Sequence, residues 1–492
     1  MGGELLVFQN IKKLLFTNFI GKILGFVREV LLAFIFGTNS IIDAFKLCNS
    51  LVLTPLNLFV GNSLQQIYIP MYNTKNNKVK FVTYVSLLIM LLSLVLCFST
   101  LIFSKEIINL FLNNGYSHEQ KLIASNFLKI FALGIPFYVY NWIFIYTLNA
   151  QKNFKENGLN VLNFNLVLIA VTSIYFFFKN IYLLPLSFCI ANFIIVLQLT
   201  LKYKKEFFRA IKAITDINVK HFAHESKIFL IKWSPLLIYT LFMQTYILVE
   251  RWLLSKDMGL IAASEYAKII TETPVFLITL PMATIGLTYF DKNNASVFRK
   301  INKMFLFVCI ASLSLGIFIH ANQEMIIKIL FMRGNFDINS LNLVVSLLQY
   351  YSIGFCFYSI NTFMFRIYNA EMRNKELSII VIGAHIITFF LLFTLYFLKI
   401  KVDEIVGVSY IVVNLLQTIV LKVRSQSLSI RFCLASFQGK FTVIVAFVIF
   451  ALLIWSKQYI NSSTLYFFTS SILLLLIFGV SLNYIRKNEG EI

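Results

Sequence analysis

The stretch 81–103, FVTYVSLLIMLLSLVLCFSTLIF, contains no charged residue and decides the fold class. An α-helix rises about 1.5 Å per residue, so a helix of about 20 apolar residues crosses the hydrocarbon core of a bilayer. The stretches 181–201 and 377–397 are nearly as long and also lack Lys, Arg, Asp and Glu. These runs predict a polytopic α-helical membrane protein.

The composition of the whole chain agrees with this prediction. Of the 492 residues, 59% are hydrophobic and 13% are charged, whereas soluble domains carry about 25% charged residues. We predict an all-α protein with 14 transmembrane helices. The second is interrupted by Pro55, Asn57, Gly61 and Asn62, and the eighth by Glu265, Lys268, Glu272, Pro274 and Pro281. In chain order the predicted spans are 14–36, 46–70, 81–103, 123–148, 158–178, 181–201, 228–252, 259–287, 304–320, 341–366, 377–398, 404–422, 441–456 and 464–485.

The positive charge of the chain is distributed over the predicted loops. The net charge is +21, which in a soluble chain would suggest a nucleic-acid partner. Here 26 of the 43 Lys and Arg residues fall in loops on one side of the predicted membrane, and only nine fall in loops on the other side. Because basic loops stay in the cytoplasm, we expect both termini to be cytoplasmic and no nucleic-acid partner.

Two parts of the chain match each other at a constant offset of 220 residues. Leu110-Phe111 matches Leu330-Phe331, and Asn141 matches Asn361. Since six helices separate the matching spans, the pattern predicts a parallel repeat of two six-helix halves. The predicted parts are an N-terminal six-helix lobe at 1–201, a basic cytoplasmic connector at 202–227, a second six-helix lobe at 228–424, and two extra transmembrane helices with a cytoplasmic tail at 425–492.

Several ionisable side chains lie inside the predicted spans, where each lipid-exposed cation would cost about 2.5–3.5 kcal/mol. Lys22 and Glu29 are seven residues apart and share a helix face, and Glu265, Lys268 and Glu272 form one polar stripe. We expect such residues to line a wet central cavity; the alternative is a set of ion pairs that only hold helices together. The predicted substrate-binding residues are Lys22, Arg28, Glu29, Asp43, Lys46, Glu250, Arg251, Glu265, Lys268 and Glu272.

The sequence lacks the signatures of an ATP-driven pump or of a common hydrolase. It contains no Gly-rich phosphate loop, no HExxH and no GxSxG. The six cysteines are scattered singly, without the spacing of a metal site. We expect a protein that is not an enzyme, with no catalytic residue, no cofactor and no metal.

Three stretches carry a family resemblance: KILGFVRE at Lys22–Glu29, QTYILVER at Gln244–Arg251 and LFMRGNFD at Leu330–Asp337. Together they resemble the motifs of the MurJ/MviN-type lipid II flippases, within the multidrug/oligosaccharidyl-lipid/polysaccharide exporter superfamily. The chain departs from the family where arginines are usual. Those positions hold Lys22, the pair Leu56 and Asn57, and Ile269.

The resemblance implies a flippase that moves an undecaprenyl-diphosphate-linked sugar precursor, lipid II, from the inner to the outer leaflet by alternating access, for peptidoglycan synthesis. It implies a multi-pass monomer of the bacterial inner membrane. Its expected partners are the lipid substrate, membrane lipids and the cell-wall synthesis machinery. A flippase for O-antigen, capsule or teichoic lipid-linked oligosaccharides is an alternative, as are a drug antiporter of the same superfamily and a membrane glycosyltransferase.

Overall fold

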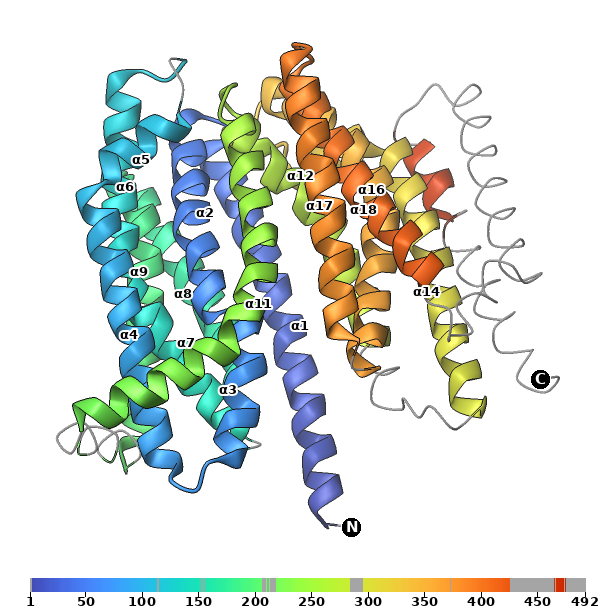
Figure 1. Ribbon diagram of the computed structural model, residues 1–492. Helices are drawn as coiled ribbons and strands as arrows, with labels where there is room; N and C mark the ends of the chain where they lie inside the picture. The colour runs from blue at the N-terminus through green and yellow to red at the C-terminus, as the bar shows by residue number, and fades with distance from the viewer. Residues whose placement is uncertain are drawn as a thin grey trace. The chain divides into compact units, whose positions relative to one another are not determined.

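The computed structural model describes residues 2–112, 115–151, 153, 155–205, 209, 212, 218–283, 295–371, 373–424, 464, 466–472 and 474. Within these residues every regular element is a helix (Figure 1), which confirms the predicted all-α class. By its contacts the chain forms two compact units, Met1–Ala262 and Ala263–Ile492.

The first unit is a helical bundle that contains the seven spans predicted from 14–36 to 228–252. Its helices are α1 (Gly2–Phe36), α2 (Ser40–Val60), α3 (Asn62–Thr74), α4 (Lys78–Ile102), α5 (Ser104–Phe111), α6 (His118–Leu133), α7 (Ile135–Ala150), α8 (Lys155–Phe178), α9 (Leu183–Lys202) and α11 (Val219–Leu254). Helix α1 packs along α8, α2 packs against α6 and α11, and α8 packs against α9. These contacts bring the first two helices of the chain beside α8 and α11.

Helices α1 and α8 approach each other closely at Gly21. A Cβ atom on Gly21 would lie 2.9 Å from Cγ1 of Val161 and 3.3 Å from the backbone nitrogen of Leu162. Gly25 follows four residues later on the same face of α1, where a Cβ atom would lie 3.6 Å from Oδ1 of Asn165. Small residues at this spacing let membrane helices pack backbone to backbone. The next turn of α1 is therefore held close to α8.

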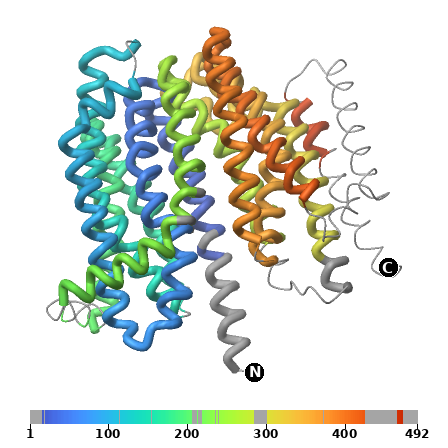
Figure 2. The backbone as a smooth tube through the Cα atoms, viewed as in Figure 1, coloured from blue at the N-terminus to red at the C-terminus, as the bar shows by residue number. Residues whose placement is uncertain are grey.

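Helix α11 is bent by 53° between Val219–Ser234 and Leu236–Leu254 (Figure 2). Pro235 stands at the bend and has no N–H to donate to the carbonyl of Ile231, four residues earlier. The hydroxyl of Ser234 donates a hydrogen bond to that carbonyl at 3.1 Å. A side chain thus supplies the bond that the proline removes, as a helix in a membrane requires.

Two other breaks fall where the sequence predicts interrupted spans. Between α2 and α3 the chain turns at Gly61, whose N–H donates to the carbonyl of Asn57 at 3.1 Å. Helix α12 (Leu260–Pro274) continues into a π-helical turn at Val275–Thr279. Such turns are rare, occur mostly as single turns inside α-helices and are frequent at functional sites.

The second unit is built around a long central helix, α16. Its helices include α14 (Ala295–Ala321), α15 (Gln323–Phe331), α16 (Ile338–Ala370), α17 (Asn374–Phe397) and α18 (Val402–Arg424). Helix α16 packs against α14 and α18, and α17 packs against α18. The spans predicted at 304–320, 341–366, 377–398 and 404–422 each coincide with one of these helices.

Nine helical segments of the described residues are long and apolar enough to cross a membrane, or ten if the bent α11 counts as one span. The chain is a multi-pass membrane protein. The predicted spans 441–456 and 464–485 lie wholly or mostly outside the described residues, so the number 14 stays a prediction. The same holds for most of the predicted parts 202–227 and 425–492. The predicted lobes 1–201 and 228–424 also stay predictions. They were inferred from a sequence repeat, whereas the two units are defined by contacts.

Candidate functional site

Three charged residues of the predicted set meet between α1 and α2. Oε1 of Glu29 accepts hydrogen bonds from Arg28, at 2.7 Å from Nη2 and 3.2 Å from Nε. Oε2 of Glu29 forms an ion pair with the ammonium group of Lys46. Glu29 and Lys46 are each only 4% exposed. We refer to Arg28, Glu29 and Lys46 as the cationic cluster, because it holds two positive charges and one negative charge.

Asn165 of α8 fixes the position of the Arg28 guanidinium. Its Oδ1 accepts a hydrogen bond from Nη1 of Arg28 at 3.1 Å. Its Nδ2 donates to the carbonyls of Gly21 and Val161, each at 3.0 Å, so the orientation of the amide is set by backbone groups. Asn165 was not among the predicted site residues, because its span also contains Asn160 and Asn163 and no sequence signal distinguishes the three.

The cationic cluster is arranged to hold a further negative charge. A buried ion costs several kcal/mol unless it is paired, and Glu29 supplies the pairing for Lys46. The Arg28 side chain is less buried, at 27% exposure. A guanidinium has five N–H donors, and within the described residues three of them are used. Two donors of Arg28 are therefore available to an anion.

Asp43 has a different set of partners. Its carboxylate accepts hydrogen bonds from the backbone N–H groups of Gly259, at 2.5 Å, and Ala262, at 2.8 Å, and from the hydroxyl of Tyr116 at 3.1 Å. The two N–H groups lie at the start of α12, where a negative charge is favoured by the helix dipole. Burial, followed by the negative charge of Asp43, raises the pKa of Tyr116. Asp43 thus anchors the start of α12.

The other predicted residues of the first unit are Glu250, Arg251 and Lys22. Glu250 and Arg251 lie near the end of α11 and are each 4% exposed. Arg251 is close enough to interact electrostatically with Asp43 and Lys46. Lys22 lies on α1 and is exposed. The first unit therefore brings Arg28 and Lys46 close to Glu29, and Arg251 close to Asp43, whereas Lys22 lies on the surface of α1.

The remaining predicted residues, Glu265, Lys268 and Glu272, belong to α12 in the second unit. All three are half-buried. The ammonium group of Lys268 lies 5.7 Å from the centre of the Tyr351 ring, within the range of a cation–π interaction. The hypothesis that all ten residues line one cavity stays a prediction.

A second feature of the first unit is a cavity of about 470 Å³ at the α2–α3 break. Among the described residues none of its lining side chains is charged. The lining includes the amides of Asn57, Gln65, Gln66, Asn157 and Gln244 and the rings of Tyr138, Trp142 and Tyr146. Oε1 of Gln244 is buried and, within the described part of the chain, has no hydrogen-bond partner. We refer to this cavity as the neutral pocket; none of the predicted site residues lines it.

A comparison with protein families matches residues 32–478 to the model of the lipid II flippase MurJ. The chain belongs to the MurJ family. A probable lipid II flippase MurJ of Aquifex aeolicus is 26% identical over 368 residues, which cover 73% of this chain and 71% of that protein. The lipid II flippase MurJ of Thermosipho africanus is 30% identical over 159 residues, 32% of this chain and 33% of that protein.

Solved structures agree with the fold of the MurJ family. A lipid II flippase MurJ in an inward closed conformation superposes with a TM-score of 0.78 at 22% identity and covers 96% of this chain and 98% of that one. An inward-facing multidrug transporter of the MATE family superposes with a TM-score of 0.63 at 10% identity and covers 87% and 95%. The family that the three motifs resemble is confirmed by the family match, and the chain shares its fold with both of these structures.

The structure separates the two residues that replace the MurJ-family arginine pair in the second span. Leu56 is fully buried, whereas Asn57 lines the neutral pocket. Position 57 is therefore the one from which a side chain reaches a cavity. Gln244, which opens the second MurJ-like motif, lines the same pocket, so these two positions were the sequence signal for it.

Proposed function

We propose that this chain moves lipid II from the inner to the outer leaflet of the bacterial cytoplasmic membrane by alternating access, with both termini in the cytoplasm. Membership of the MurJ family supports the substrate. The observation that carries the proposal is the cationic cluster, which keeps two basic groups and one carboxylate inside an apolar helical unit. Ionisable residues within membrane helices mark substrate or ion pathways.

In this proposal the diphosphate of the substrate binds to Arg28. The planar guanidinium can hold two phosphate oxygens at once, and hydrogen bonds between charged partners are about twice as strong as neutral ones. Glu29 and Asn165 hold Arg28 in place from two sides. Lys46 forms an ion pair with Glu29 and does not bind the diphosphate directly. Its positive charge attracts the diphosphate electrostatically.

The neutral pocket is suited to the sugar part of the substrate. Side-chain amides both donate and accept hydrogen bonds, which matches the many hydroxyl and acetamido groups of an amino sugar. The aromatic rings of Tyr138 and Trp142 offer apolar surface to the sugar C–H groups. A pocket without formal charge would also avoid a second binding site for the diphosphate.

The test is rescue of a bacterium depleted of its own lipid II flippase. The unmodified chain should restore growth, and Arg28→Ala should abolish rescue while the protein is still inserted. Arg366→Ala is the matched control, because Arg366 is an exposed arginine of α16, and it should rescue fully. Full rescue by Arg28→Ala, or no rescue by the inserted unmodified chain, would contradict the proposal.

A further inference from the structure

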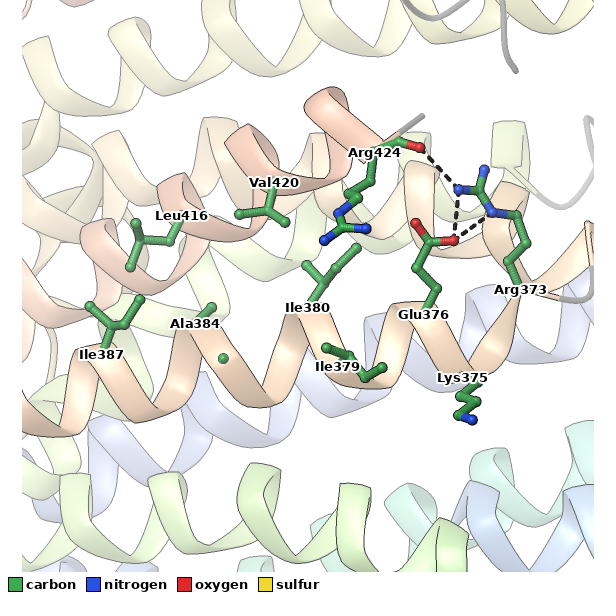
Figure 3. Close-up of a pocket in the computed structure, with 11 residues that line it drawn as sticks. Arg373, Lys375, Glu376, Ile379, Ile380, Ala384, Ile387, Leu416, Val420 and Arg424 are labelled. Atoms are coloured by element: carbon green, nitrogen blue, oxygen red, sulfur yellow. Dashed lines mark hydrogen bonds and ion pairs between the residues drawn. The ribbon is translucent and has the colours of Figure 1, made fainter. Parts of the chain in front are cut away.

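A groove of about 480 Å³ runs between α17 and α18 in the second unit (Figure 3). Its apolar part is formed by residues spaced four apart, which share one face of a helix. They are Ile379, Gly383 and Ile387 on α17, with Leu416 and Val420 on α18. We refer to this feature as the α17–α18 groove.

The apolar part of the groove is open along its length. A Cβ atom on Gly383 would meet no atom within 4 Å, so the glycine leaves free space at the centre of the groove. Ile379 is 63% exposed and Ile387 is 54% exposed. Because α17 is long and apolar enough to span the membrane, this open surface is suited to a lipid chain.

One end of the groove is basic. Arg373 and Lys375 stand at the start of α17 and Arg424 at the end of α18, and Glu376 is the single acidic residue of the lining. Arg373 is held by the carboxylate of Glu376 at 2.8 Å and by the carbonyl of Arg424 at 3.0 Å. Figure 3 shows both contacts and the Arg424 guanidinium extending toward α17.

Two of these cations are available to a ligand. Within the described residues the side chains of Lys375 and Arg424 form no ion pair and no hydrogen bond, and both are exposed. Arg373 also pairs with the carboxylate of Glu371 at 3.2 Å, so the charged end holds three basic and two acidic groups and has a net charge of about +1. An anionic headgroup is therefore favoured over a zwitterionic one.

We propose that the α17–α18 groove binds an anionic phospholipid of the bilayer. The lipid phosphate is held by Arg424 and Lys375, and one acyl chain lies along Ile379, Gly383 and Val420. Basic pockets between transmembrane helices on the cytoplasmic side bind anionic lipids, and the guanidinium fork of Arg424 matches the geometry of a phosphate. The groove belongs to the second unit and the cationic cluster to the first, and the proposal takes from the proposed function only the cytoplasmic side of the charged end.

The basic end alone has a simpler explanation, since Lys and Arg gather on the cytoplasmic side of membrane proteins for reasons of topology. Cations of that kind would attract anionic lipids without using the groove. A bound lipid requires both the charges and the space beside Gly383. The two explanations therefore differ in the effect of filling the groove.

The experiment measures lipids retained by the full-length purified protein, by native mass spectrometry during titration with phosphatidylglycerol or phosphatidylcholine. The unmodified protein should retain phosphatidylglycerol at least roughly tenfold more tightly than phosphatidylcholine. Lys375→Gln with Arg424→Gln should weaken phosphatidylglycerol binding roughly ten- to thirtyfold. Gly383→Leu keeps every charge but fills the groove, and should weaken binding by at least roughly tenfold.

The matched control removes two cations from the loop that joins the other ends of α17 and α18. Lys399→Gln with Lys401→Gln changes the net charge equally and should leave binding within about twofold, because both residues are exposed at that end. Equal losses in both charge variants, or unchanged binding in Gly383→Leu, would overturn the proposal in favour of diffuse attraction. Preferential retention of a polyprenyl phosphate over phosphatidylglycerol would also overturn it.

Discussion

The cationic cluster and the α17–α18 groove both gather basic side chains, but they differ in burial and in pairing. Lys46 of the cluster is 4% exposed and is paired with a carboxylate. Lys375 and Arg424 of the groove are exposed and, among the described residues, have no ion-pair partner. A cation inside a span needs a buried counter-charge, whereas a cation at a helix end keeps its water and needs none. In the comparison of Lys46 with Lys375 and Arg424, ion pairing therefore follows burial.

The largest expected effect comes from removing the carboxylate of the cluster. Glu29→Gln leaves Arg28 and Lys46 without their counter-charge, and should lower the free energy of unfolding by about 3–5 kcal/mol. The matched change in the groove, Glu376→Gln, acts on a half-exposed pair and should cost at most about 1 kcal/mol. Thermal unfolding of both purified variants in detergent measures the difference. Equal losses would show that pairing does not follow burial.

A new cation in the second span should have an effect that depends on its exact position. Leu56 is fully buried, so Leu56→Arg places an unpaired charge in the core at a cost of several kcal/mol and should sharply reduce the amount of inserted protein. Asn57→Arg reaches the neutral pocket and should insert normally. Quantifying both variants in isolated membranes tests this, and normal insertion of Leu56→Arg would contradict it.

The smallest of the three effects concerns the residue that positions Arg28. Asn165→Ala removes a hydrogen bond to a charged group, a loss of about 1.5–3 kcal/mol, and should reduce lipid II transport roughly ten- to hundredfold. Among the described residues, the Asn163 side chain on the same helix bonds only to the exposed amide of Gln198, so Asn163→Ala is the control. Transport assays in vesicles should separate the two; similar transport in both variants would remove Asn165 from the site.

The fold class was predictable because apolar runs such as 81–103 have one physical solution in a membrane, the helix. The charged part of the candidate site was predictable for a related reason. A charge inside a span is expensive, so residues such as Arg28 and Glu29 stand out in the sequence. The predicted interruptions near Gly61 and Pro274 also coincide with observed breaks.

The partners of these charges were not predictable from spacing. Asp43 accepts hydrogen bonds from backbone groups 216 and 219 residues away, and no local pattern encodes such a contact. Asn165 and the amides of the neutral pocket are uncharged, so they leave little trace in a hydropathy profile. The pocket also combines side chains from several helices of the first unit, and only tertiary packing brings them together.

The bend in α11 has a mechanical consequence for this unit. In an unbroken helix a change of angle strains the ladder of backbone bonds, and an opened carbonyl facing lipid is costly. At the bend the Ser234 hydroxyl donates a hydrogen bond to the carbonyl of Ile231. Because a hydroxyl can rotate, it can keep this bond when the angle changes. Pro235 and Ser234 together therefore form a hinge. The angle between the two segments of α11 can change there while the carbonyl of Ile231 keeps a hydrogen bond.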